Sequence, residues 1–143
     1  MSMDPVVIKR TFACTKRQLF DAWSKPELMA QWFYAGATLH TQSTVTSSFV
    51  VGGAYELIMH DLDQDHVMSG TYKTIIRYSH ISFTWTSMMA TDSLVALEFK
   101  ELSPNRTEMT LTHSDFPSEE SRNAHNEGWG RCLASLEKFL LGY

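Results

Sequence analysis

Two histidines are the side chains of this sequence best suited to acid–base chemistry. His113 ends a segment of alternating apolar residues that predicts a strand with one buried face. His125 precedes Trp129 by four residues, so on a helix the two side chains share one face. An imidazole changes charge near neutral pH, but no acid is placed by the sequence to orient either ring as a general base. Asp115 follows His113 closely but falls in a predicted loop, and we therefore identify no catalytic residue.

Alternating acids between His60 and His66 resemble the start of a calcium-binding loop. Such a loop needs a glycine at its sixth position and a bidentate glutamate at its twelfth. Here His66 and Tyr72 occupy those positions. The segment more simply predicts a solvated hairpin tip at residues 61–65, and we expect neither a metal site nor a cofactor.

The two cysteines, Cys14 and Cys132, are predicted to be small buried residues and not nucleophiles. Two are too few for a disulfide scaffold and fit a reducing compartment, so we expect a cytoplasmic location. The first residues show neither a basic leader nor an apolar stretch, so we expect no signal peptide. The sequence contains no phosphate-binding loop, no dinucleotide-binding glycine motif and no nucleophile elbow of the hydrolase type.

Composition and charge argue against nucleic acids and membranes as partners. The net charge is −4 and no run of basic residues exists, which argues against a nucleic-acid surface. No stretch approaches the roughly 18 apolar residues of a membrane span. With 143 residues, 43% hydrophobic and 20% charged, the chain has the size and composition of a single domain, residues 1–143, and we expect a monomer or homodimer.

The elements that must position these residues begin with a strand at 6–12. Thr15 and Gln18 have the spacing of a capping box and predict a helix start. Pro26 ends that helix and can open a second short one. Ser118 predicts the N-cap of a long C-terminal helix that ends near Leu141.

Residues 44–113 change to a period of two, with turn residues between the segments. This pattern is typical of an antiparallel meander with one buried face. The fold class we predict is α+β: a curved antiparallel sheet of six or seven strands around the long helix, with two short helices after the first strand.

A long helix on a strongly twisted sheet cannot touch the sheet along its whole length, so we expect a cavity between them. Gly128 and Gly130 in mid-helix, and Gly70 on a strand, suggest places where a side chain would collide with the sheet or with a ligand. The alternative is that these glycines only allow close packing of helix and sheet.

Motifs spread along nearly the whole chain resemble a known family. They are Arg10-Thr-Phe12, Phe20-Asp-Ala-Trp23, Pro26-Glu27, Gln31-Trp32, Gly52-Gly53-Ala-Tyr55, Gly70-Thr-Tyr72, Ile81-Ser-Phe83-Thr-Trp85, Leu111-Thr-His113, and Phe116-Pro117 through His125-Asn-Glu-Gly128-Trp129 to Leu136. In this order they resemble the START-like superfamily, also called SRPBCC or helix-grip. Within it, they resemble the family similar to the C-terminal domain of the activator of heat-shock-protein-90 ATPase.

The resemblance implies a helix-grip layout with an apolar pocket between the sheet and the C-terminal helix. Relatives in the superfamily bind lipids, hormones or polyketides, and a minority are cyclases or aromatases. The family often continues after the second-helix tryptophan with Trp-Gly-Pro, where this chain has Phe33-Tyr34-Ala35-Gly36. The co-chaperone's separate N-terminal domain has no counterpart in these 143 residues, so chaperone activation is not carried over.

We therefore expect the chain to bind a small hydrophobic molecule, lipid-like or aromatic, without catalysis. The alternatives are a cyclase-like or aromatase-like enzyme that uses pocket histidines, and a protein-interaction or stress-response module related to chaperone ATPase activators. Inward-phased and aromatic residues form the predicted pocket wall: Trp32, Tyr55, Leu57, Tyr72, Phe83, Trp85, Leu97, Met109, His113, His125, Trp129 and Cys132.

Overall fold

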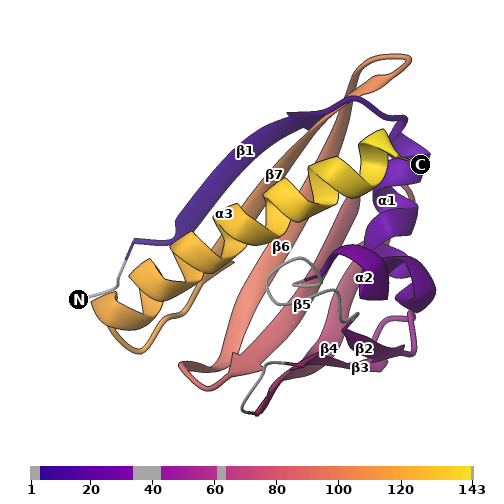
Figure 1. Cartoon of the computed structure of the whole chain (residues 1–143). Helices are drawn as coiled ribbons and strands as arrows, with labels where there is room; N and C mark the ends of the chain where they lie inside the picture. The colour runs from indigo at the N-terminus through magenta and orange to yellow at the C-terminus, as the bar shows by residue number, and fades with distance from the viewer. Residues whose placement is uncertain (1–3, 34–42, 61–63, 143) are drawn as a thin grey trace.

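A twisted antiparallel sheet with a long helix across one face dominates the computed structural model, which describes residues 4–33, 43–60 and 64–142 (Figure 1). The seven strands lie in the order β1-β7-β6-β5-β4-β3-β2, and each neighbouring pair is antiparallel. Their bounds are β1 Val6–Phe12, β2 Thr44–Ser47, β3 Ala54–His60, β4 Asp65–Ile76, β5 His80–Ser87, β6 Ala90–Ser103 and β7 Arg106–Ser114. The predicted α+β fold class and meander are confirmed.

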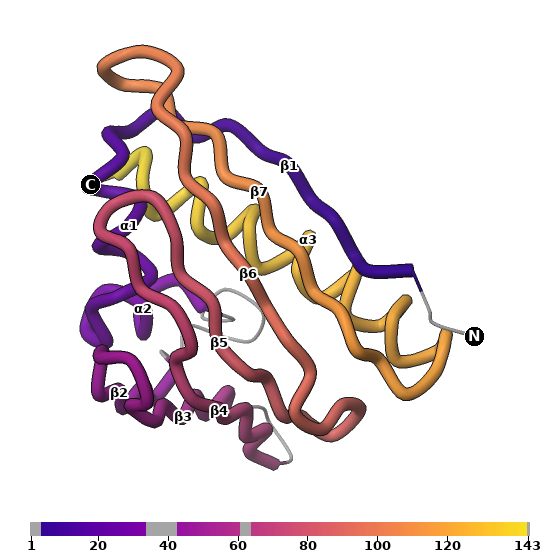
Figure 2. The backbone as a smooth tube through the Cα atoms, turned by 180° about the vertical axis from the view of Figure 1, so that it is seen from behind, coloured from indigo at the N-terminus to yellow at the C-terminus, as the bar shows by residue number. Residues whose placement is uncertain are grey.

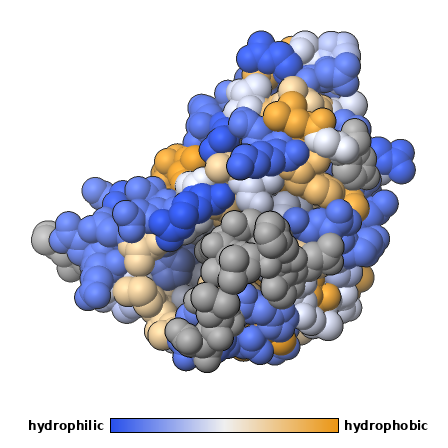
Figure 3. Space-filling view, viewed as in Figure 1, coloured by the Kyte–Doolittle hydropathy of each residue, from blue (hydrophilic) through white to orange (hydrophobic). Residues whose placement is uncertain are grey.

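The helix α3, Glu119–Leu141, runs for 23 residues across the sheet, and Figure 2 shows the strands from the opposite side. The Ser118 side chain accepts a hydrogen bond from the Ser121 N–H at 3.1 Å, as its predicted N-cap role requires. The outward side of α3 is mostly hydrophilic (Figure 3). None of the described helices is long and apolar enough to cross a membrane.

Two short helices, α1 Lys16–Ser24 and α2 Pro26–Trp32, lie beside the C-terminal half of α3 (Figure 1). The predicted capping box is present, because Thr15 and Gln18 exchange hydrogen bonds of 2.8 and 3.1 Å. Pro26 takes the first position of α2, where its missing N–H costs nothing.

One hairpin matches the turn that the sequence predicts, and a second differs from its predicted tip at 61–65, because Asp65 is the first residue of β4. Ser103 pairs with Arg106, which leaves Pro104 and Asn105 as a tight turn between β6 and β7. His60 pairs with Asp65 across β3 and β4, and their side chains meet at 2.9 Å. Residues 61–63 of the predicted tip lie outside the described residues, as does the segment 34–36 in which the chain departs from its family.

The glycines of the helix and the sheet have different roles. A Cβ on Gly70 would lie 2.7 Å from the carbonyl carbon of Thr84 and closer still to its oxygen, so β4 and β5 can approach only if this residue is glycine. Gly128 is buried, whereas Gly130 is exposed and a Cβ there would meet nothing within 4 Å. The expectation that Gly130 avoids a collision is therefore wrong, because its helical position faces away from the sheet.

The core between the sheet and the helices is rich in aromatic rings. All four tryptophans are at most 2% exposed. Trp23 packs edge-on against Trp32 at 4.8 Å, and the Trp32 indole donates to the carbonyl of Ala22 at 3.0 Å. These contacts tie α1 and α2 together under the sheet.

We predict that Gly70→Ala lowers the free energy of unfolding by about 2–3 kcal/mol, because the obstructing atoms are backbone atoms that cannot rotate away. Gly130→Ala is the matched control and should raise the free energy by about 1 kcal/mol through helix propensity. Urea denaturation of both variants measures the two effects. Equal stability of Gly70→Ala and the wild type would contradict the packing described here.

Candidate functional site

A pocket of about 270 Å³ lies between the middle of α3 and the strands β3, β4 and β5. Ala124, Gly128 and Arg131 line it from α3, at the i, i+4 and i+7 positions of one helical face. His125 joins them from the neighbouring position. Trp85 and Ser87 of β5, together with residues of β3, β4 and the β5–β6 turn, form the opposite wall.

Methionine dominates the apolar part of the wall. Met59, Met68, Met88 and Met89 line the pocket, which is half of the eight methionines in the sequence. Methionine side chains are flexible and polarisable, so they adapt to the shape of an apolar ligand and contact aromatic rings favourably. The sequence analysis did not identify these four as pocket residues. The available signal in the sequence was the adjacent pair Met88-Met89 between two alternating segments. In the structure Met88 is 79% exposed.

Trp85 and His125 are the two predicted pocket residues that line this pocket. Six others are at most 1% exposed within the packed core: Trp32, Leu97, Met109, His113, Trp129 and Cys132. The remaining four surround a void of about 10 Å³, no larger than one water molecule: Tyr55, Leu57, Tyr72 and Phe83. The side chains of these ten residues mostly contact one another and not an open cavity.

His113 belongs to a chain of hydrogen bonds that crosses the core. The Trp129 indole N–H donates to His113 Nδ1 at 3.0 Å, so this nitrogen carries no proton. The proton is then on Nε2, which lies 2.8 Å from Ser93 Oγ. The Ser93 hydroxyl in turn donates to the backbone carbonyl of Trp85 at 2.7 Å. Every polar atom of the buried His113 side chain is thus satisfied by a neutral ring.

Burial, and to a smaller extent the nearby His125, lowers the pKa of His113 from 6.5 to about 3. The hydrogen bond from Trp129 also keeps the His113 ring neutral, because a proton on Nδ1 would point at the Trp129 N–H. His113 is therefore neutral at physiological pH, and neither of its nitrogens is available to a ligand.

His125 faces the pocket with one nitrogen. Its Nδ1 lies 2.7 Å from the carbonyl oxygen of Ser121 and must donate to it, which leaves the lone pair on Nε2. Ser87 Oγ lies 3.2 Å from Nε2 and can donate to it. Burial lowers the pKa of His125, an effect opposed by the hydrogen bond to Ser121. The site thus contains a neutral imidazole with an accepting nitrogen beside a hydroxyl group.

Trp85 and Trp23 each have a buried indole N–H without a hydrogen-bond partner among the described residues. Trp85 is among the residues that line the pocket, whereas Trp23 is not. A buried donor without an acceptor costs roughly 1–3 kcal/mol. Both nitrogens are closed off by the surrounding core, so neither is a contact point for a ligand.

Both cysteines are buried, and neither forms a disulfide. Burial raises the pKa of the Cys14 thiol to about 11, so it stays protonated and unreactive at neutral pH.

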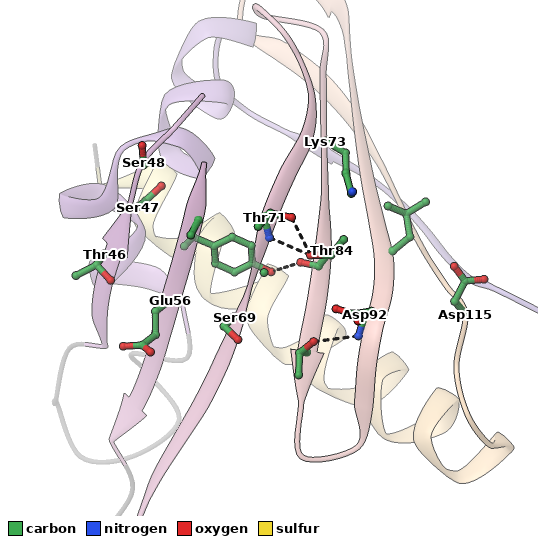
Figure 4. Close-up of a pocket in the computed structure, with 15 residues that line it drawn as sticks. Thr46, Ser47, Ser48, Glu56, Ser69, Thr71, Lys73, Thr84, Asp92 and Asp115 are labelled. Carbon is green, nitrogen blue, oxygen red and sulfur yellow. Dashed lines mark hydrogen bonds between the residues drawn. The ribbon is translucent and has the colours of Figure 1, made fainter. Parts of the chain in front are cut away.

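A wider hollow of about 1190 Å³ lies on the sheet face turned away from α3. Figure 4 shows short polar side chains from β2 to β5, among them Thr46, Ser69, Thr71 and Thr84, on this surface. Several of these groups satisfy one another, as in the 2.9 Å bond from the Thr71 N–H to Thr84 Oγ1. The sequence analysis did not predict this groove. The smaller pocket beneath α3 is the better candidate, because most of the residues that line it are apolar.

A seven-stranded antiparallel sheet that holds a C-terminal helix, with two short helices after the first strand, defines the helix-grip fold. Residues 13–140 match the family described as "Activator of Hsp90 ATPase homolog 1-like protein". The chain belongs to this family, as its resemblance predicted.

Solved structures share the fold at low sequence identity. An uncharacterised protein from Rhizobium leguminosarum is 24% identical, with a TM-score of 0.81 over 97% of this chain and 95% of its own. A protein of unknown function from Staphylococcus aureus is 16% identical, with a TM-score of 0.80 over 97% and 95% of the two chains. CalU16 from Micromonospora echinospora is 19% identical, with a TM-score of 0.74 over 94% and 74%. No curated protein matches the sequence.

We predict that His113 makes stability fall at mildly acidic pH. Its pKa is lower in the folded state than the unfolded value of 6.5, so the unfolded chain binds the extra proton between pH 6.5 and about 3. The contribution of His113 is fully present above pH 6.5 and should shrink by about 2.5 kcal/mol from pH 6 to pH 4.

His113→Asn is the matched variant, because its amide oxygen can still accept from Trp129 while the group no longer titrates. The free energy of unfolding, measured by urea denaturation from pH 4 to pH 7, should depend less steeply on pH in the variant. Parallel curves for the variant and the wild type would show that His113 is not the group responsible.

Proposed function

We propose that this protein binds a compact hydrophobic molecule in the pocket between α3 and strands β3–β5, without chemical change to that molecule. The observation that carries the proposal is the wall itself, in which four methionines and Trp85 surround about 270 Å³ of open space. The void surrounded by Tyr55, Tyr72 and Phe83 in the core measures only about 10 Å³ by comparison. An apolar pocket with few polar groups is the usual form of a small-molecule site.

The size of the pocket restricts the ligand. Small-molecule sites commonly measure roughly 300–1,000 Å³, so this pocket of about 270 Å³ lies just below that range. A one-ring or two-ring molecule fits such a space, whereas a long acyl chain would extend into solvent. Among the ligand types expected from the sequence, size favours the small aromatic type over the lipid-like type.

The polar groups at the pocket are better suited to orienting a ligand than to catalysing a reaction. His113 is fully used within the core, so of the two predicted histidines His125 alone presents a nitrogen toward the pocket side. No carboxylate orients His125, since its second nitrogen donates to the backbone carbonyl of Ser121. Its lowered pKa also makes it a weak base.

An enzyme is the second candidate, favoured by the 3.2 Å contact between Ser87 Oγ and His125 Nε2 at the pocket. The two functions differ in what becomes of a bound compound. Mass spectrometry of the compound recovered after incubation supports the binder if the mass is unchanged. A changed mass that requires His125, tested with His125→Gln, supports the enzyme.

We predict that Gly128→Leu abolishes binding while the protein remains folded, because the new side chain projects into the pocket from its helical wall. Gly130→Leu is the matched control, since the same change on the same helix points to solvent and should leave affinity unchanged. Titration of small aromatic compounds, followed by tryptophan emission, measures both.

Co-purifying molecules detected by native mass spectrometry provide a second readout for the same pair of variants. Binding that survives in Gly128→Leu, or is lost equally in Gly130→Leu, would contradict the assignment of this pocket.

A further inference from the structure

His60 contacts a carboxylate on one side of its ring and a hydroxyl group on the other. Its Nδ1 lies 2.9 Å from Asp65 Oδ1, and its Nε2 lies 2.7 Å from Thr44 Oγ1. An ionised carboxylate can only accept, so Nδ1 carries the ring proton and Nε2 keeps its lone pair. The Thr44 hydroxyl therefore donates its hydrogen bond to Nε2.

The pairing of three strands places these side chains on one face of the sheet. Asp65 lies directly opposite His60 across β3 and β4, and Thr44 of β2 lies opposite Ile58, two residues from His60. Residues that lie directly opposite share a face of the sheet, and so do residues two apart along a strand. Thr46 follows Thr44 in this phase and lines the groove of Figure 4, so the three groups are on the sheet face turned away from α3.

A hydroxyl group, a base within hydrogen-bond reach of it and an acid that orients the base together form the pattern of an activated nucleophile. His113 and His125 lack the third member, because uncharged groups orient both rings. The members of the new group are open to solvent: Thr44 is exposed, and the side chains of His60 and Asp65 are 31% and 57% exposed. An incoming compound can therefore reach the hydroxyl group without a change in the fold.

A small apolar surface lies beside this hydroxyl group. Ile58 is opposite Thr44, and Val67, which is 46% exposed, is opposite Ile58 on the next strand. Residues opposite one another lie roughly 5 Å apart, so an aromatic ring can cover Ile58 and Val67 while a group attached to the ring lies at Thr44. The size of this surface favours a compact substrate.

We propose that Thr44 is a nucleophile that takes the acyl group of a small aryl ester, with His60 as its general base and Asp65 as a positioning residue. Thr44 Oγ1 attacks the carbonyl carbon of the ester while its proton passes to His60 Nε2. The bond from that carbon to the phenolic oxygen then breaks, and His60 gives the proton to the departing phenol. Water releases the acyl group from Thr44 by the same route, which yields the carboxylic acid and restores the hydroxyl group. The site is separate from the pocket beneath α3 and goes beyond the binding proposed there.

Para-nitrophenyl acetate tests this inference on the full chain, because the released nitrophenolate is coloured and mass spectrometry of acid-quenched samples locates the acetyl group. We expect acetylation of Thr44 in the wild type. Thr44→Val keeps the shape of the side chain without its hydroxyl group, and His60→Gln removes the base. Each should lower the rate of nitrophenolate release by about tenfold or more. Thr46→Val is the matched control, since the same change on the same strand and face should leave the rate unchanged.

Asp65→Asn separates the positioning of His60 from a merely structural role. The amide of the variant can donate to Nδ1, which moves the ring proton to Nε2 and leaves no lone pair for the Thr44 proton. NMR of the ring nitrogens of His60 should therefore show the proton on Nδ1 in the wild type and on Nε2 in Asp65→Asn, and the rate should fall with this change.

A rate that Thr44→Val leaves unchanged, with acetyl groups on lysines alone, overturns the inference. An equal loss of rate in Thr44→Val and Thr46→Val overturns it as well, because the hydroxyl beside His60 would then have no special part. Gly128→Leu should block the pocket beneath α3 without an effect on nitrophenolate release. Failure of this inference therefore leaves the proposed ligand binding intact, and failure of the binding leaves this inference intact.

Discussion

The hydrogen bond from the Trp129 indole to His113 is the contact on which the docking of α3 depends. It joins the helix to β7, and the chain of bonds continues through Ser93 on β6 to the backbone of Trp85 on β5. Four consecutive elements of the chain are therefore fixed to one another by directional contacts inside an apolar core. Because each member is buried, loss of any one would leave another polar group unsatisfied, which makes the network cooperative.

The same network separates the roles of two neighbouring imidazoles. The rings of His113 and His125 lie 4.9 Å apart, close enough that a charge on one disfavours a charge on the other. His113 must stay neutral to accept the hydrogen bond from the Trp129 indole, so its role is to stabilise the core. His125 is held by the backbone of its own helix and stays open on its other side to Ser87 and the pocket. His113 stabilises the fold, and His125 is the histidine that our proposal assigns to ligand recognition.

Local signals in the sequence predicted the fold because each depends on adjacent residues. The capping box at Thr15 and the N-cap at Ser118 were correct to the residue, and the period of two located the strands. The pocket wall was harder to predict, because alternation shows which side chains face inward but not which of them close-pack. Leu97 and Met109 face inward and fill the core, whereas the methionines near the hairpin ends border open space, and that difference depends on how far α3 stands from each strand.

The order of the strands has a consequence for how the chain assembles during synthesis. β1 is made first, yet its partner in the sheet is β7, with Val6 opposite His113 and Phe12 opposite Thr107. On the ribosome the strands β2 to β6 can pair in succession as they emerge, whereas the first strand stays unpaired until about a hundred more residues have been added. Its backbone donors and acceptors are exposed throughout that interval. Closure of the sheet and docking of α3 therefore wait until β7 and α3 have both been made, so the pocket between the helix and the sheet forms only after residues 106–141 have been added.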